Sequence, residues 1–128
     1  MPLSDPIGDL LTRMRNAQHG RHTDCRAPWS RLKQSLCELL KSEGYLADAK
    51  SDGAGPEKEV VVAFRDDRPV LILKRISTPG ARVYVSAGEI RHYLHGNSLA
   101  ILSTSLGLIT DKVAREKNVG GELFCTVS

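Results

Sequence analysis

A proline followed by a glycine near the middle of the chain places the strongest single constraint on the fold. In the segment Thr78 to Ala81, Pro79 fixes one central φ of a tight turn and Gly80 tolerates the positive φ that the next position can require. The pair therefore predicts a turn that separates two parts of the chain. The full length of 128 residues suits one domain or two small subdomains that share a core. We predict an N-terminal α/β subdomain at residues 1–76 and a C-terminal subdomain at residues 77–128.

The N-terminal part begins with two amphipathic helices. Asp5 is a good N-cap for the first helix, and Pro6 suits the first helical position because its missing N–H has no partner there. The second helix has Ser30 as its cap and ends at Gly44. The spacing of the apolar residues predicts a buried stripe on each helix, made of Ile7, Leu10, Leu11 and Met14 on the first and Leu32, Leu36, Leu39 and Leu40 on the second.

The rest of the chain reads mainly as short strands. Residues 19–29 are polar and predict a link, whereas residues 45–51, 59–65 and 70–77 predict three strands of a small antiparallel sheet on which the helices pack. Strands are also predicted at 81–86, 98–104 and 122–128, with one short helix that begins near Thr110 and ends at Gly120 and Gly121. The fold class is α+β, with a two-helix, three-strand N-terminal subdomain followed by a smaller, mostly β C-terminal subdomain that has one short helix.

The charge of the chain permits a polyanionic partner without requiring one. The net charge is +3, but it is unevenly distributed. Residues 1–41 hold seven basic and four acidic side chains, residues 42–70 hold four and seven, and residues 71–128 hold seven and four. If the two positive parts meet in the fold, one face is basic; a solvated mixed surface is the alternative that charge alone favours.

The sequence contains no run of about 18 apolar residues and no secretory signal, so we expect a cytoplasmic protein without a membrane partner. The three cysteines are far apart and form no disulfide framework, as expected for reduced thiols.

Metal-binding and catalytic interpretations have little support. The triplet His19, His22 and Cys25 offers only three ligands, whereas a structural zinc site needs four. There is no phosphate-binding glycine loop and no nucleophile elbow, and a hydrolase would have to combine the serines near residue 104 with His92 or His95. We therefore expect no enzyme activity, no metal, no cofactor and no small-molecule substrate.

Three hydroxyl residues in a row, Ser103, Thr104 and Ser105, stand between a predicted strand and the predicted helix start. Hydroxyls both donate and accept hydrogen bonds, which suits base edges and the RNA 2′-OH. The alternative is that they only satisfy a polar turn, and the triplet alone favours that alternative.

Three motifs in this order resemble a known family. The segments "DPIGDLLTRMRNA", "RISTPGARVY" and "ILSTSLGLITDKVAREKNVGGELFC" are similar to the bacterial form of the small-ribosomal-subunit protein number eight family, and the resemblance covers essentially the whole chain. It implies a structural constituent of the small ribosomal subunit that binds the central domain of small-subunit ribosomal RNA directly and early in assembly. It also implies neighbouring small-subunit ribosomal proteins as partners. The runner-up function is an RNA-binding translational regulator that acts on messenger RNA outside the ribosome.

The resemblance also implies which residues contact RNA. In the C-terminal part they are Ser103, Thr104, Ser105, Gly107, Gly120, Gly121, Glu122, Tyr84 and Arg82. In the N-terminal part they are Arg13, Arg15, Asn16, Arg31 and Lys33, which are expected to bind the backbone.

The chain departs from the family pattern at two places. Leu106 stands where a lysine is common, and "VSAGE" follows Tyr84 where a basic run is common. Both departures remove charge that would meet phosphate, so we expect weaker and less salt-dependent RNA binding.

Overall fold

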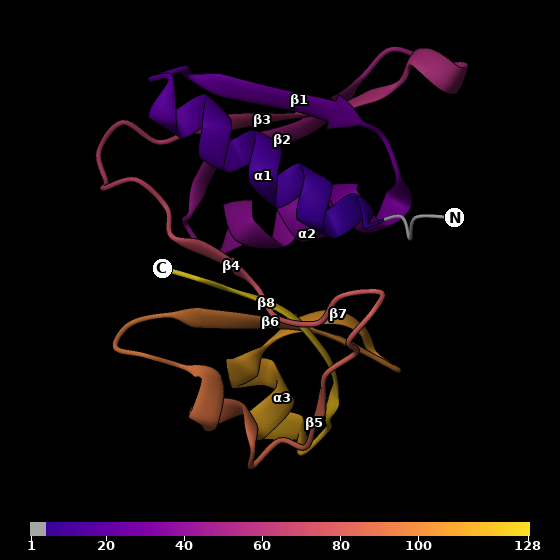
Figure 1. The fold of residues 1–128 in the computed structure, drawn as a ribbon, viewed down its shortest axis with the longest axis vertical. Coiled ribbons are helices and arrows are strands. Elements are labelled where there is room, and N and C mark those ends of the chain that lie inside the picture. The colour runs from indigo at the N-terminus through magenta and orange to yellow at the C-terminus, as the bar shows by residue number, and fades with distance from the viewer. Residues whose placement is uncertain (1–4) are drawn as a thin grey trace. The chain divides into compact units, whose positions relative to one another are not determined.

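The computed structural model describes residues 5–128, which form two compact units. One unit comprises residues 9–71, and the other joins residues 5–8 to residues 72–128. The predicted α+β fold class is confirmed, with three α-helices and two antiparallel sheets in the described residues (Figure 1). The predicted domains at 1–76 and 77–128 stay a prediction, because compactness alone does not show what folds independently; residues 1–4 of the first lie outside the described residues.

The first helix begins where the sequence predicts. Helix α1 (Pro6–His19) is capped by Asp5, whose Oδ1 accepts a hydrogen bond from the N–H of Gly8 at 3.1 Å. This carboxylate satisfies one of the free N–H groups at the helix start. The predicted apolar stripe is buried along its whole length, from Ile7 to Met14.

The second helix, α2 (Arg31–Ser42), also has the predicted cap, since the hydroxyl of Ser30 accepts from the N–H of Lys33 at 3.2 Å. Its buried stripe is partly different from the prediction. Leu36 and Leu40 are fully buried, but Leu32 is exposed, and Lys33 and Cys37 are buried instead. Lys33 can be buried because its ammonium donates to the carbonyl of Pro28 at 2.7 Å.

The sheet of residues 9–71 has the order β1–β3–β2, with β1 (Asp24–Pro28), β2 (Leu46–Asp52) and β3 (Glu59–Phe64) all antiparallel. The prediction of a polar link at residues 19–29 is wrong for its second half, which is strand β1. Only Cys25 and Ala27 of β1 face inward, and two apolar residues were too few to reveal a strand. Both helices lie on one face of this sheet (Figure 1).

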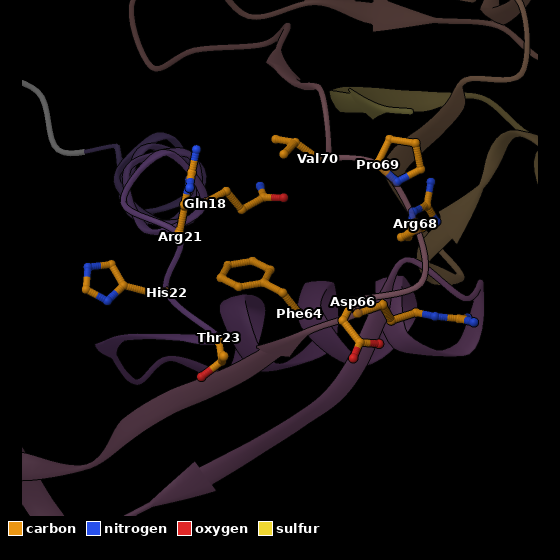
Figure 2. A pocket seen from close by; sticks show the side chains of 10 residues that line it. Gln18, Arg21, His22, Thr23, Phe64, Asp66, Arg68, Pro69 and Val70 are labelled. Atoms are coloured by element: carbon orange, nitrogen blue, oxygen red, sulfur yellow. The ribbon is translucent and has the colours of Figure 1, made fainter.

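A pocket of about 300 Å³ opens in the same unit, between the C-terminal end of α1 and the segment that follows β3 (Figure 2). Gln18 and Arg21 line it from the helix side, and residues 64–70 line much of the rest.

The other unit is a five-stranded antiparallel sheet with the order β4–β8–β6–β7, and β5 pairs with β8. Its strands are β4 (Leu73–Arg75), β5 (Tyr84–Val85), β6 (Leu99–Thr104), β7 (Gly107–Thr110) and β8 (Gly121–Val127). The third strand predicted for the N-terminal sheet therefore belongs to this sheet, as β4. The short 3-10 helix η2 (Ile90–Tyr93) and helix α3 (Asp111–Lys117) complete the unit.

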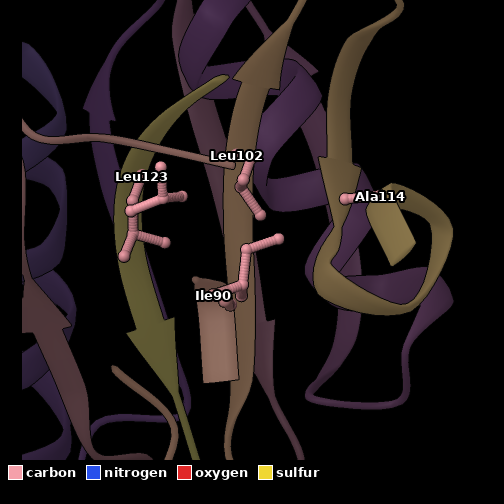
Figure 3. Close-up of a cluster of buried hydrophobic side chains, with 6 residues drawn as sticks. Ile90, Leu102, Ala114 and Leu123 are labelled. Atoms are coloured by element: carbon pink, nitrogen blue, oxygen red, sulfur yellow. The ribbon is translucent and has the colours of Figure 1, made fainter. Parts of the chain in front are cut away.

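The core of this unit lies between the sheet and its two helical segments. Figure 3 shows Leu102 of β6 and Leu123 of β8 on neighbouring strands, with Ile90 of η2 and Ala114 of α3 in the same cluster. Each of these four side chains is fully buried. The cluster fixes β6 against β8, and these two strands carry four of the nine C-terminal candidate residues, Ser103, Thr104, Gly121 and Glu122.

The predicted turn at Pro79 and Gly80 is confirmed, although it lies within the unit of residues 72–128 and not between the two units. Thr78 and Ala81 exchange two backbone hydrogen bonds of 3.1 and 3.2 Å across it. The predicted end of the last helix is wrong, since α3 ends at Lys117 and Asn118 is its left-handed C-cap with φ 52°. Asparagine tolerates this conformation, so the helix needs no glycine there. Gly120 instead lies just before β8, and Gly121 begins that strand.

Among residues 5–128, no helix is both long and apolar enough to cross a membrane.

Candidate nucleic-acid interface

The hydroxyl triplet lies on a β-hairpin rather than on a strand-to-helix connection. Ser103 and Thr104 end β6, Ser105 and Leu106 form the turn, and Gly107 begins β7 opposite Thr104. The expected strand-to-helix position is therefore wrong, because the four residues of β7 stand between the turn and α3. Gly107 has φ 97°, which is a conformation that side chains other than glycine rarely adopt.

The three hydroxyls have different roles in the hairpin. The Thr104 hydroxyl donates to the carbonyl of Gly107 at 3.1 Å and accepts from the N–H of Leu106 at 3.0 Å. It therefore holds the turn closed. Within residues 5–128, the hydroxyls of Ser103 and Ser105 make no hydrogen bond, so both can donate and accept at the surface.

Strand pairing brings Tyr84, Ser103 and Glu122 into one row. Glu122 of β8 lies opposite Ser103 of β6 on one side and opposite Tyr84 of β5 on the other. Residues directly opposite in an antiparallel pair point to the same face of the sheet. Tyr84 leaves most of its ring in solvent, with 69% of its surface exposed. We call the candidate residues on and around this row and the hairpin turn the hairpin surface; they are Arg82, Tyr84, Ser103, Thr104, Ser105, Gly107, Gly120, Gly121 and Glu122.

The carboxylate of Glu122 is held in place by two donors. Its Oε2 accepts from the Ser77 hydroxyl at 2.6 Å and from the Arg82 guanidinium at 2.8 Å. Burial is the largest single influence on the pKa of Glu122 and acts to raise it. The hydrogen bonds from Ser77 and Arg82, with the charges of Arg82 and Arg75, outweigh burial, and the pKa lies below its ordinary value. Glu122 is therefore a charged and oriented acceptor at neutral pH.

Ser77 is a residue of this interface that sequence reasoning missed. Its side chain is fully buried, and its hydroxyl accepts from the N–H of Val83 at 3.1 Å while it donates to Glu122. It thus ties the predicted turn at residues 78–81 to the start of β8. The only signal in the sequence was its place immediately before that turn.

Gly120 and Gly121 allow the chain to pass close to its neighbours. A Cβ on Gly121 would collide with the backbone carbonyl of Ser103, and a Cβ on Gly120 would collide with the carbonyl of Val85. Both collisions are with backbone, which cannot move aside as a flexible side chain can. The two glycines thus set the approach of β8 to β6 and β5 and position Glu122.

The N-terminal candidates lie in the other unit and are largely engaged in internal contacts. Arg13 donates from Nε to Asp9 at 2.9 Å and from Nη1 to the carbonyl of Arg26 at 3.4 Å. Arg15 donates to the hydroxyl of Thr12 at 3.4 Å. Asn16 is exposed on the same helix. These three residues remain at the surface of α1.

The two candidates of α2 differ sharply. Arg31, the first residue of the helix, is exposed. Lys33 is only 6% exposed, and its ammonium donates to the Pro28 carbonyl at the end of β1. Its structural role is to join α2 to that strand. We call Arg13, Arg15, Asn16, Arg31 and Lys33 the N-terminal basic group.

Other ligand-type residues do not gather into a site. His19 and His22 are exposed, whereas Cys25 is buried in β1. Within residues 5–128, no three histidine, cysteine, aspartate or glutamate side chains are placed to hold a metal ion.

The fold and this surface define an α+β protein that presents neutral hydroxyls, an aromatic ring and a fixed carboxylate from the rim of an antiparallel sheet. Comparison with known proteins gives the family. The model of the family described as ribosomal protein S8 matches residues 5–128. The chain is 46% identical to a small ribosomal subunit protein uS8 of Anaeromyxobacter dehalogenans and 45% identical to one of Leptospira biflexa, with 99% of each chain covered in both cases. A uS8 protein of Synechococcus is 42% identical over the same share of both chains.

The chain therefore belongs to the ribosomal protein S8 family. The family resemblance read from the three sequence motifs is confirmed. The contacts of the individual residues with RNA stay predictions.

Proposed function

We propose that this chain is a structural constituent of the small ribosomal subunit, where it binds the central domain of small-subunit ribosomal RNA directly and helps its assembly. Membership of the ribosomal protein S8 family supports this function, as do full-length relatives named as small ribosomal subunit proteins. We propose neighbouring ribosomal proteins as further partners and the cytoplasmic ribosome as its location. Its part is structural, and it catalyses no reaction.

The main observation in support of RNA binding is that the three hydroxyls of the triplet have different hydrogen-bonding roles. Thr104 closes the hairpin turn, while the Ser103 and Ser105 hydroxyls on either side of it have no hydrogen-bond partner within residues 5–128. A hydroxyl of this kind can donate to a base acceptor, accept from a base amino group, or do either with a 2′-OH. Because the hairpin is already ordered, binding loses little conformational freedom in this loop.

Tyr84 and Glu122 extend the same surface. The exposed ring of Tyr84 is suited to stack on an unpaired base or to pack against a ribose. Only Oε2 of Glu122 is used within residues 5–128, so Oε1 is available to accept from a base amino group. In this interface Arg82 first orients Glu122, and its exposed guanidinium can also reach phosphate.

The N-terminal basic group supplies contacts to the RNA backbone. Arg13, Arg15, Asn16 and Arg31 lie at the surface of two helices and can approach phosphate oxygens. Lys33 contributes indirectly, because its ammonium is already bonded to Pro28.

Ser105→Ala tests the proposed binding surface. We expect the affinity for a small-subunit central-domain RNA fragment to fall by about 1–2 kcal/mol, measured by filter binding at fixed salt. The melting temperature should not change, because the Ser105 hydroxyl makes no hydrogen bond within residues 5–128. Ser51→Ala, at an exposed position of β2, is the matched control and should leave affinity unchanged. Equal affinity in the Ser105 variant and the wild type would contradict the proposed role of this hydroxyl.

Cofractionation tests the proposed place in the subunit. The tagged chain should sediment with small subunits in a sucrose gradient and stay there at moderate salt. Recovery only in slow fractions bound to messenger RNA would favour a translational regulator instead. A hydrolytic activity that Ser105→Ala abolishes would contradict the structural role.

A further inference from the structure

The pocket in residues 9–71 has a lining that is rich in hydrogen-bond donors and positive charge. Three arginines, at positions 21, 65 and 68, and one carboxylate, that of Asp66, line it (Figure 2). Its volume of about 300 Å³ is far larger than the roughly 30 Å³ that one water molecule occupies in the liquid. The pocket thus has room for a ligand larger than a bound water.

Gln18 lines this pocket and carries a buried donor. Its Oε1 accepts from the backbone N–H of Leu71 at 2.9 Å, which determines which way the side-chain amide is turned. The amide nitrogen Nε2 is buried and has no hydrogen-bond partner among residues 5–128. In Figure 2 the side chain extends from α1 toward the space between Phe64 and Val70. A buried donor without a partner is costly, so this N–H group is expected to meet an acceptor.

Arg68, another lining residue, carries a second buried donor. Its guanidinium lies 4.3 Å from the centre of the Tyr45 ring, and its Nη1 donates to the carbonyl of Gly44 at 3.2 Å. These two contacts set the plane of the guanidinium. Its Nε is buried, and it too has no partner within the described part of the chain.

Arg68 and Arg65 also differ in their ion pairs. Arg65 donates from Nε and Nη2 to both oxygens of Asp67, at 2.8 and 2.6 Å. Arg68 makes no ion pair with any carboxylate of residues 5–128. Of these two guanidiniums, only that of Arg65 is neutralised by a direct ion pair.

These features select the chemistry of a ligand. The two buried groups that lack partners are both donors, and Arg68 has no direct ion pair within residues 5–128, so a ligand with acceptor oxygens and negative charge suits them. Phe64, Pro69 and Val70 add apolar surface beside the donors. A nucleotide has a phosphate that can accept from the donors and a planar base that can pack on the apolar wall. A carboxylate side chain has acceptor oxygens but no planar base.

We propose that this pocket binds one nucleotide of the RNA, with its phosphate near Gln18 and Arg68 and its base against Phe64. The proposal rests on the RNA-binding function proposed above. It assigns to residues 9–71 an RNA contact separate from the N-terminal basic group and from the hairpin surface.

Gln18→Glu is the sharpest variant for this pocket. It keeps an oxygen for the Leu71 N–H but replaces the open donor by a negative oxygen, which repels phosphate. We expect affinity for the central-domain RNA fragment to fall about tenfold or more at fixed salt. Lys50→Gln is the control, because it makes the same change in net charge at an exposed position of β2 in the same unit. A Gln18→Glu variant that binds RNA no more weakly than Lys50→Gln overturns the proposal.

A second measurement uses the wild-type chain and so does not depend on the folding of a variant. The Gln18 side-chain NH₂ and the Arg68 Nε–H each give a separate nitrogen-correlated NMR signal. Titration with uridine 5′-monophosphate should shift both signals saturably. No shift would mean that the pocket holds only water, and an equal shift with acetate at the same concentrations would mean a carboxylate site for a protein partner. Either result overturns the proposal.

The two proposals can fail separately. If the wild-type chain does not bind the RNA fragment at all, the proposed function fails, while the nucleotide titration still tests the pocket. If the wild type binds and Ser105→Ala weakens binding but Gln18→Glu matches its control, only the nucleotide pocket is overturned.

Discussion

The hairpin surface and the N-terminal basic group are built in opposite ways. The hairpin surface takes Tyr84, Ser103 and Glu122 from three strands and places them side by side by strand register. The N-terminal basic group takes its residues from two successive helices, and there Arg13 and Lys33 already donate to backbone carbonyls of β1, at Arg26 and Pro28. The candidate residues of the hairpin surface therefore form one exposed surface. In the N-terminal basic group, by contrast, some of the candidate residues make internal hydrogen bonds.

The difference shows what each region can contribute to binding RNA. Neutral hydroxyls and a restrained carboxylate depend on exact placement, so the hairpin surface is suited to read bases and riboses. Arginines on helix surfaces are suited to phosphate, whose recognition tolerates some freedom of position. The first region should therefore be sensitive to small backbone changes, and the second should be sensitive to salt.

Gly121→Ala should have the largest effect, because it disturbs the pairing of β8 with β6, on which the hairpin surface depends. The new Cβ would meet the Ser103 carbonyl and, at 2.9 Å, the Cγ2 of Thr104. We expect the free energy of unfolding to fall by about 2–3 kcal/mol, measured by urea denaturation. RNA affinity should fall as well, since Ser103 and Glu122 would shift relative to each other.

Gly88→Ala is the matched control for this substitution. A Cβ at Gly88 meets no atom within 4 Å, so stability should stay close to that of the wild type. If both alanine variants were equally stable, the close approach of β8 to β6 would not be what positions the interface.

Glu122→Gln should come next, with an effect that depends on pH. The substitution removes the charge that pairs with Arg82 and should lower the free energy of unfolding by about 1–2 kcal/mol at pH 7. The folded state lowers the pKa of Glu122, so its stabilisation is present above the ordinary value of 4.5 and is lost as the pH falls through the lowered pKa. Urea denaturation should show that the difference in the free energy of unfolding between wild type and variant is smaller at pH 3 than at pH 7. If this difference were the same at both pH values, the carboxylate charge would not be the source of the stability.

Substitutions of Lys33 and Arg31 in α2 should have smaller effects on stability and binding, and they test the N-terminal basic group directly. Lys33→Met keeps the length of a buried side chain but removes the ammonium that Pro28 accepts from, and should cost about 1 kcal/mol of stability. It should leave the salt dependence of RNA binding unchanged. Arg31→Gln should do the reverse, with unchanged stability and a log–log salt slope smaller by about 0.9. A similar loss of slope in both variants would show that Lys33 leaves Pro28 to reach phosphate.

Much of the fold was predictable because local signals agreed with the tertiary structure. Asp5 and Ser30 are caps, the stripe of α1 is buried, and the Pro79–Gly80 turn is in place. Strand β1 was not predictable, because its five residues make sense as a strand only beside β3. The start of α3 near Thr110 was predicted correctly, but its end was not, since Gly120 and Gly121 look like a helix end when only neighbours along the chain are considered.

The candidate site was predictable in outline and not in its division of roles. The sequence pointed to Ser103, Thr104 and Ser105 as a group, and nothing in it showed that only the middle hydroxyl closes the turn. Nor could it show that Lys33 is buried, because a lysine near a helix start ordinarily lies in solvent. Both distinctions arise from contacts with residues that only the folded chain brings near.

Leu106→Lys should have the smallest effect and tests how the hairpin surface works without a cation at its tip. The Leu106 side chain is 55% exposed and stands in the turn beside Ser105. A lysine there should raise the log–log salt slope of RNA binding by about 0.9 and tighten binding at low salt, with less gain as salt increases. The wild-type slope itself should stay well below about 8, because the uncharged hydroxyls Ser103 and Ser105 give no salt dependence. A wild-type slope of that size, or no change on adding the lysine, would mean that cations elsewhere already saturate the phosphate contacts and that the neutral hairpin is not what limits binding.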